Sequence, residues 1–368
     1  MSDAATMQAT DRPMFHGLDL IRLASFIAIM QFHISLIHYY ETTVPLTKES
    51  VIAAWIDVYA RSISFSGFTI IFLTSLLTGI SGASRPARRR LFLGLSVGWV
   101  IFSALMHQSF GWFLSWDIYP LLFFGFLLCT VLEQTSLRAL RAAGVLGYAM
   151  LFIPFWDFGF LFETWPQVWL DVLGFASCDR EIAEWPVLPW LGLLVGGYAV
   201  GVELRRILAS GGRAVLQWHK RELYLVWLPL LALSVTQWGP FFNINLGARF
   251  SCEAYRQPPL IFWSHFIWPV FLIRASLVPT VQDFLARFRF VRWISGLAVS
   301  RKFWLAYLLH YLIAHAISWG LTTSRVEQTR WGPEVVTAST LIFLPLVEIS
   351  CRAVLVVLRW VSRFGSRP

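Results

Sequence analysis

Charged residues are scarce in this chain. Asp, Glu, Lys and Arg make up 14% of its 368 residues, whereas a soluble domain holds about a quarter. Hydrophobic residues account for 57% of the chain, and the mean hydropathy is +0.62. This composition argues against an ordinary soluble domain and predicts a polytopic membrane protein whose partner is the lipid bilayer.

Cysteine is also rare, and its spacing argues against a structural zinc site. None of the four cysteines forms a CxxC pair: Cys129, Cys178, Cys252 and Cys351. The histidines include no HExxH motif. His310 and His315 are five residues apart, so their side chains point in different directions on a helix. We therefore expect no metal.

The N-terminal segment MSDAATMQATDRPMFHG lacks the features of a secretory signal peptide. It has neither a basic region followed by an apolar one nor a small-residue cleavage site. Residues 1–16 are therefore expected to form a cytoplasmic tail, and the first apolar span is expected to remain in the mature protein.

Long apolar runs recur along the rest of the chain and predict an all-α bundle. We expect ten membrane-spanning helices, within one membrane domain (17–358) followed by a basic cytoplasmic tail (359–368). They fall near 17–40, 62–82, 91–107, 117–133, 142–156, 187–204, 222–238, 259–278, 303–320 and 335–358. The aromatic segment 160–176 contains acidic residues and a proline, so we interpret it as interfacial or re-entrant. If it spans instead, every later helix inverts.

The basic residues predict the orientation of these helices. They gather after the even-numbered spans, at 84–90, 138–141, 203–222, 284–302 and 359–367. Cytoplasmic loops are enriched in Lys and Arg, so both termini are expected in the cytoplasm of an inner or plasma membrane protein. The net charge of +9 is explained by these short loops, and we expect no nucleic acid partner.

Two of the expected outer loops contain a cysteine each, Cys178 and Cys252. If that face is periplasmic or extracellular, a disulfide between them is one outcome, and two free thiols are the other.

The first span contains ionisable residues that share one helical face. Eleven residues of helix rotate by about 1100°, so Arg22 and His33 lie within ~20° of each other, about 16 Å apart along the axis. Asp19 precedes Arg22 by three residues and can pair with it. A snorkelling arginine and a buried histidine would each be ordinary, but their alignment in one span favours a functional role.

Further polar residues are expected at mid-depth or toward the outer face. His265 and His310 lie within spans, where ionisable groups usually face the bundle interior or a water-filled path. His38, beside two tyrosines, is better explained as an interface anchor. The arginines of RPARRR, Arg88, Arg89 and Arg90 among them, are first of all a topology signal, with phosphate binding as a lesser alternative.

These residues resemble a known family. The segment GLDLIRLASFIAIMQFH (17–33) resembles the first helix of the acyltransferase-3 family of integral membrane acyltransferases, which carries a basic residue, ten residues and then histidine. FSGFTIIFLTSLLTG (65–79) is similar to the second helix of that family, and RKFWLAYLLHYLI (301–313) to a late helix with Tyr, Leu, one residue and His. The segments 116–129 and 184–201 also resemble heparan-glucosaminide N-acetyltransferase-like proteins of the same superfamily, although His33 favours the acyltransferase-3 branch.

The resemblance implies transfer of an acyl group, often acetyl, from cytoplasmic acyl-CoA to a hydroxyl of an extracytoplasmic or lipid-linked glycan. Arg22 would bind the phosphates of CoA, helped by Arg88, Arg89 and Arg90 or by Arg205 and Arg206, and His33 would act as general base. His310, Tyr307 and Trp185 are candidates for stabilising the oxyanion. Asp19 and His265 complete the expected substrate-binding set. Direct transfer and an acyl-enzyme relay both remain open, as does a separate extracytoplasmic partner protein.

Two other functions remain open. A proton-coupled transporter or exporter of a polar or glycan-like substrate would also use polar residues in a ten-helix bundle, although no repeated half is evident. A non-catalytic membrane scaffold is the other. The sequence names neither the acceptor nor the length of the acyl group.

Overall fold

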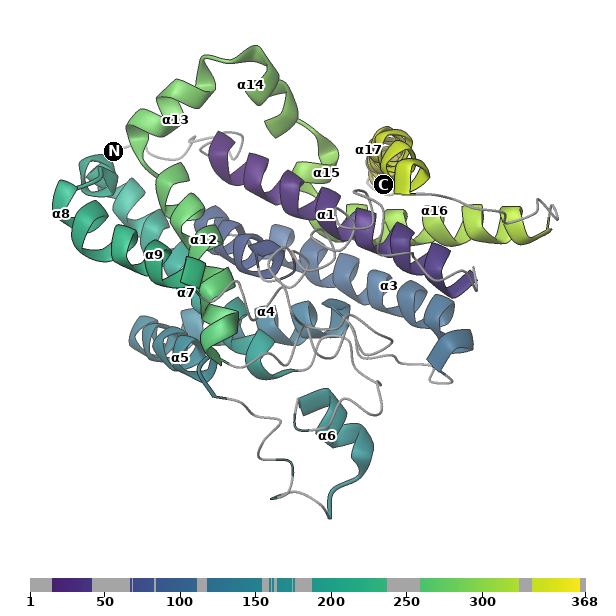
Figure 1. The fold of residues 1–368 in the computed structure, drawn as a ribbon, viewed down its shortest axis with the longest axis horizontal. Helices are drawn as coiled ribbons and strands as arrows, with labels where there is room; N and C mark the ends of the chain where they lie inside the picture. Colours follow the sequence, from purple (N-terminus) through teal and green to yellow (C-terminus); the bar gives the residue numbers. More distant parts are fainter. Residues whose placement is uncertain are drawn as a thin grey trace.

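A computed structural model describes residues 15–41, 67, 69–82, 84–110, 118–153, 159, 161, 164–173, 175, 187–236, 259–323 and 333–364. Within these ranges the chain is all-helical (Figure 1). Each of the ten expected segments contains helix. The first five are α1 (His16–Glu41), the helix Thr69–Ser81, α3 (Arg85–Phe110), α4 (Ile118–Thr135) and α5 (Leu137–Met150). The others are α7 (Val187–Ala209), α8 (Lys220–Glu222) continuing through η3 (Leu223–Trp227) into α9 (Leu228–Thr236), α12 (Pro259–Ser276), α16 (Phe303–Thr323) and α17 (Pro333–Phe364).

Among the residues whose side chains the structure describes, three helical segments are long and apolar enough to cross a membrane: α4, α7 and Leu341–Leu358 of α17. The prediction of membrane character is supported to that extent. The full set of ten crossings and the orientation of the termini remain proposals.

The short helices connect the long ones on the basic side of the molecule. They are η2 (Gly212–Leu216), α13 (Pro279–Ala286), α14 (Arg289–Ser295) and α15 (Ala298–Arg301). The expected interfacial segment contains α6 (Gln167–Leu173), which lies on the opposite side of the molecule from α13 and α14 (Figure 1). Seven residues of helix extend about 10 Å, a third of the hydrocarbon core.

Several expected boundaries were wrong: α7 ends at Ala209 where 204 was expected, α17 ends at Phe364 where 358 was expected, and the third and fifth segments differ most clearly. The expected basic loop 84–90 is helical from Arg85 onward, because Ser84 accepts the backbone N–H of Arg88 and a proline in the first turn costs no hydrogen bond. The fifth segment was placed at 142–156, but α5 begins at Leu137, where the Ser136 hydroxyl accepts the N–H of Ala139, and ends at Met150. Polar starts of helices were missed because hydropathy marks only their apolar part.

α7 is closely packed between neighbouring helices. It contacts α4 and α5, and most of its residues are buried. Glycines allow the closest approaches: a Cβ on Gly147 of α5 would lie 2.6 Å from the Gly192 carbonyl oxygen of α7, and a Cβ on Gly201 would lie 2.2 Å from the Leu76 carbonyl oxygen. Small residues bring helix backbones together in this way inside membranes.

Ion pairs join helix ends that the orientation argument places on one side. Arg141 at the start of α5 donates to both carboxylate oxygens of Glu203 near the end of α7, at 2.8 and 2.9 Å. Arg274 near the end of α12 similarly holds Glu222 at 2.9 and 2.8 Å. Arg205 of α7 pairs with Glu133 of α4. The antiparallel arrangement of these helices therefore agrees with the predicted alternation.

Candidate functional site

The candidate site is built on α1, which packs against α12, α13, α14, α15, α16 and α17. Its first turn is fixed on both sides. His16 Nδ1 lies 3.0 Å from the Ser295 hydroxyl, and that hydroxyl donates to the Val291 carbonyl. Because the hydroxyl proton is directed at the Val291 carbonyl, the Ser295 oxygen accepts the hydrogen bond from His16. A Cβ at Gly17 would come within 2.5 Å of Ser276, so α1 begins directly against the end of α12.

Asp19 and Arg22 form the ion pair predicted from their spacing. The Arg22 Nη2 donates to Asp19 Oδ1 at 2.7 Å, and the two side chains are only 4% and 12% exposed. A pair this deeply buried contributes little net stability compared with apolar side chains, because both ions lose their hydration. Its presence in a mostly apolar helix is the reason to regard it as functional.

α16 carries the second part of the site, an aromatic cluster around His310. The imidazole is fully buried, and its ring centroid lies 5.0 Å from that of Tyr307 and 4.8 Å from that of Tyr311. Phe102 of α3 packs edge-on against Tyr311 at 5.0 Å. Tyr119, at the start of α4, contacts Tyr307 at 6.0 Å and donates its hydroxyl to the Trp304 carbonyl at 2.8 Å.

Phe26 connects the two parts. It is fully buried, follows Arg22 by one helical turn, and its ring lies 5.6 Å from the His310 ring in an edge-to-face arrangement. On α1, Phe26 is about 6 Å beyond Arg22 and about 10 Å short of His33 along the axis. His310 therefore contacts α1 at a position between Arg22 and His33.

Several predicted residues are located only in part. The backbones of His33 and His265 lie in α1 and α12, but their side chains fall outside the described residues, and Trp185 is outside them altogether. The same holds for Cys178 and Cys252, so their pairing stays open. Cys129 and Cys351 are buried free thiols.

The predicted phosphate-binding arginines lie in the first turns of α3. Arg88 is half-buried, whereas Arg89 and Arg90 are exposed. Arg205 and Arg206, considered as helpers, are engaged with Glu133 and Glu203 respectively.

Sequence reasoning places Phe26 on the same helical face as Arg22 and His33 but assigns no role to Phe26, Phe102, Tyr119 or Tyr311. Phe26 follows Arg22, and Tyr311 follows Tyr307, by four residues, so each pair shares a helical face. That spacing was available in the sequence, but apolar aromatics in a membrane helix do not stand out from lipid-facing ones.

No group of three or more His, Cys, Asp or Glu residues that could hold a metal ion occurs in the part of the chain that the structure describes. Comparison of the chain with family models, with curated proteins and with solved structures found no match.

Proposed function

We propose that the chain is an integral membrane acyltransferase that moves an acyl group, acetyl being the first candidate, from cytoplasmic acyl-CoA to a hydroxyl of an extracytoplasmic or lipid-linked glycan. The main support is the contact between Phe26 and His310, which adds a second histidine-bearing helix to the Arg22–His33 face of α1. The motif resemblance of the first and late helices provides the chemistry.

In the proposed mechanism, Arg22 binds a phosphate of the donor, and His33 removes the proton of the acceptor hydroxyl. The alkoxide attacks the thioester carbonyl, the carbon–sulfur bond breaks, and CoA leaves as a thiolate that takes up the proton. We assign His310 and Tyr307 the role of hydrogen-bond donors to the developing oxyanion. His310 contacts α1 between Arg22 and His33, along the route that the acyl group would take from the donor to the acceptor.

Replacing His33 with asparagine is expected to lower acyl transfer at least about 100-fold, because asparagine cannot accept the proton. The assay supplies radiolabelled acetyl-CoA to purified protein in vesicles that contain a glycan extract from its own host, and counts label released by mild alkali, as an O-acetyl ester would be. His38→Ala is the matched control and should have a mild effect. Near-normal turnover of the His33→Asn variant would contradict the proposal that His33 acts as general base.

The same vesicles test the transporter alternative. Wild-type protein that moves a glycan across the membrane without any acyl product would contradict the enzyme proposal. Loss of transfer in His33→Asn together with retained folding, judged by the thermal midpoint, would support it over a scaffold.

We further propose that both termini and the even-numbered helix ends face the cytoplasm. A cysteine at exposed Ser210, in a Cys178→Ser, Cys252→Ser background, is expected to react with an impermeant maleimide only after the cells are permeabilised. Labelling in intact cells would invert the topology and place Arg22 on the outer side, which the donor-binding role does not allow.

A further inference from the structure

α13 and α14 form a surface with an unusual combination of side chains. Phe284, Phe288, Phe290 and Trp293 are 55%, 47%, 67% and 62% exposed. They pair with one another on the surface, Phe284 edge-on to Phe288 at 5.1 Å and Phe290 stacked on Trp293 at 6.0 Å. A water-facing helix would place polar residues at these positions, so we call this set the aromatic face.

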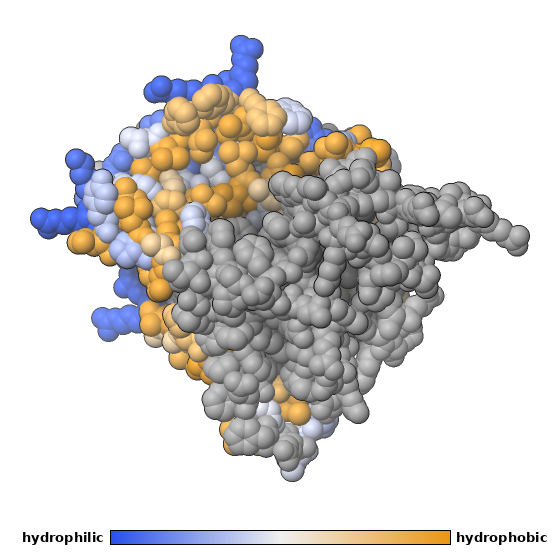
Figure 2. Space-filling view, viewed as in Figure 1, coloured by the Kyte–Doolittle hydropathy of each residue, from blue (hydrophilic) through white to orange (hydrophobic). Residues whose placement is uncertain are grey.

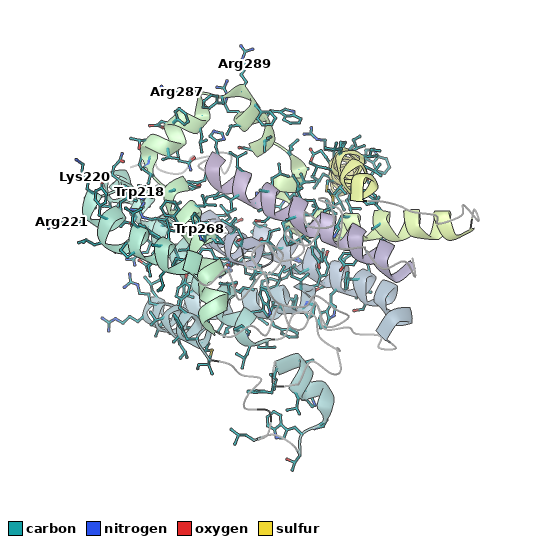
Figure 3. All side chains as sticks on the ribbon, viewed as in Figure 1. Trp218, Lys220, Arg221, Trp268, Arg287 and Arg289 are labelled. Carbon is teal, nitrogen blue, oxygen red and sulfur yellow. The ribbon has the colours of Figure 1, made fainter. Side chains whose placement is uncertain are left out.

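Arginines alternate with the aromatic rings. Arg287, Arg289 and Arg292 are exposed, and none of them forms a salt bridge with another described residue. Figure 3 shows Arg287 and Arg289 pointing away from the molecule at its upper edge, and Figure 2 shows blue side chains projecting there from an apolar surface. Residues 277–302 contain five cations and a single carboxylate, Asp283.

The opposite side of α14 is anchored firmly in the protein. Val291, Ile294 and Ser295 are buried, and Ser295 bonds to His16 at the start of α1. The aromatic face is therefore held outward by a packed inner face and is not a loosely folded loop. It lies at the end of the molecule where α1 begins (Figure 1), on the side where the other basic helix ends gather.

We propose that α13 and α14 form a binding surface for anionic phospholipids in the membrane leaflet on the basic side of the protein. Phe284, Phe288, Phe290 and Trp293 insert among the upper acyl chains, as aromatic residues do at membrane interfaces. Arg287, Arg289 and Arg292 bind the headgroup phosphates, and each guanidinium can do so through two hydrogen bonds. Charge complementarity selects anionic over zwitterionic lipid.

The proposal is tested by quenching of Trp293 with brominated lipids. The full-length protein is reconstituted into vesicles in which either phosphatidylglycerol or phosphatidylcholine carries brominated acyl chains. Because the chain has 19 tryptophans, the contribution of Trp293 is the difference between wild type and Trp293→Phe. We expect this contribution to be quenched by both lipids, and more strongly by phosphatidylglycerol.

The triple variant R287Q/R289Q/R292Q should abolish the preference for phosphatidylglycerol, since each arginine near a charged surface contributes about fivefold in affinity. The control variant R85Q/K220Q/R221Q removes three exposed cations elsewhere on the basic side and should retain it. All six positions are exposed, so neither variant should impair folding.

Three results would overturn the proposal. If neither lipid quenches Trp293, the aromatic face lies outside the membrane. If both lipids quench the wild-type protein equally, the arginines do not select anionic headgroups. A preference that millimolar inorganic phosphate abolishes would assign the arginines to a soluble anion. None of these readouts depends on acyl transfer, so the outcome is independent of the proposed enzymatic function.

Discussion

Replacing Arg22 with alanine is expected to abolish acyl transfer and to destabilise the protein by about 3–5 kcal/mol. The stability loss follows because the substitution leaves the Asp19 carboxylate without its ion-pair partner in a site where that side chain is only 12% exposed. The loss of activity follows if Arg22 binds the donor. Thermal unfolding in detergent and the acyl-transfer assay measure the two effects separately.

The double variant Asp19→Asn, Arg22→Met separates structure from function. It removes both charges and keeps a long apolar side chain, so it should recover most of the lost stability, because a buried ion pair can be replaced by neutral groups at little cost. Acyl transfer should stay lost. Arg221→Ala removes an exposed cation on the same side of the protein and should change neither property.

A double variant that is both stable and active would contradict the role of Arg22 in donor binding. It would leave the pair as a structural feature of the first turn of α1, beside the His16–Ser295 bond that fixes the same turn.

Replacing Gly147 with valine is expected to prevent α5 from packing against α7. A Cβ there would lie 2.6 Å from the Gly192 carbonyl oxygen and 2.9 Å from its Cα, and neither backbone atom can rotate away. Overpacking of a buried site costs about 1–3 kcal/mol even where side chains yield, so a clash between two backbones should cost more. We expect little folded protein, measured as the monodisperse fraction on size-exclusion chromatography after extraction.

Ala142→Leu is the matched control for this substitution. It adds the same number of carbons to the same helix at an exposed position, where lipid or detergent can accommodate them. Equal yields and thermal midpoints within about 2 °C for the two variants would contradict the close packing of α5 on α7. The bidentate Arg141–Glu203 pair joins the same two helices, but at 50% and 33% exposure it contributes too little to compensate.

The sequence by itself determined the helical segments and part of the site. Ten apolar runs predicted ten helices, because hydrocarbon-length apolar segments must satisfy their backbone hydrogen bonds internally. It also predicted the Asp19–Arg22 pair, because a spacing of three residues fixes a local neighbour on any helix. The structure adds that Arg274 pairs with Glu222, at helix ends that the predicted alternation of spans puts on one side.

Only the tertiary structure decided which helices meet. Hydropathy is nearly uniform around a membrane helix, so no periodicity in α1 or α16 indicated that Phe26 would contact His310, or that Tyr119 would reach the Trp304 carbonyl. The sequence likewise did not predict that α13 and α14 have one buried and one exposed face. Burial of Ile294 and exposure of Trp293 depend on where α1 lies. Local spacing is encoded along one helix, whereas contacts between helices depend on side-chain shapes that only the assembled bundle brings together.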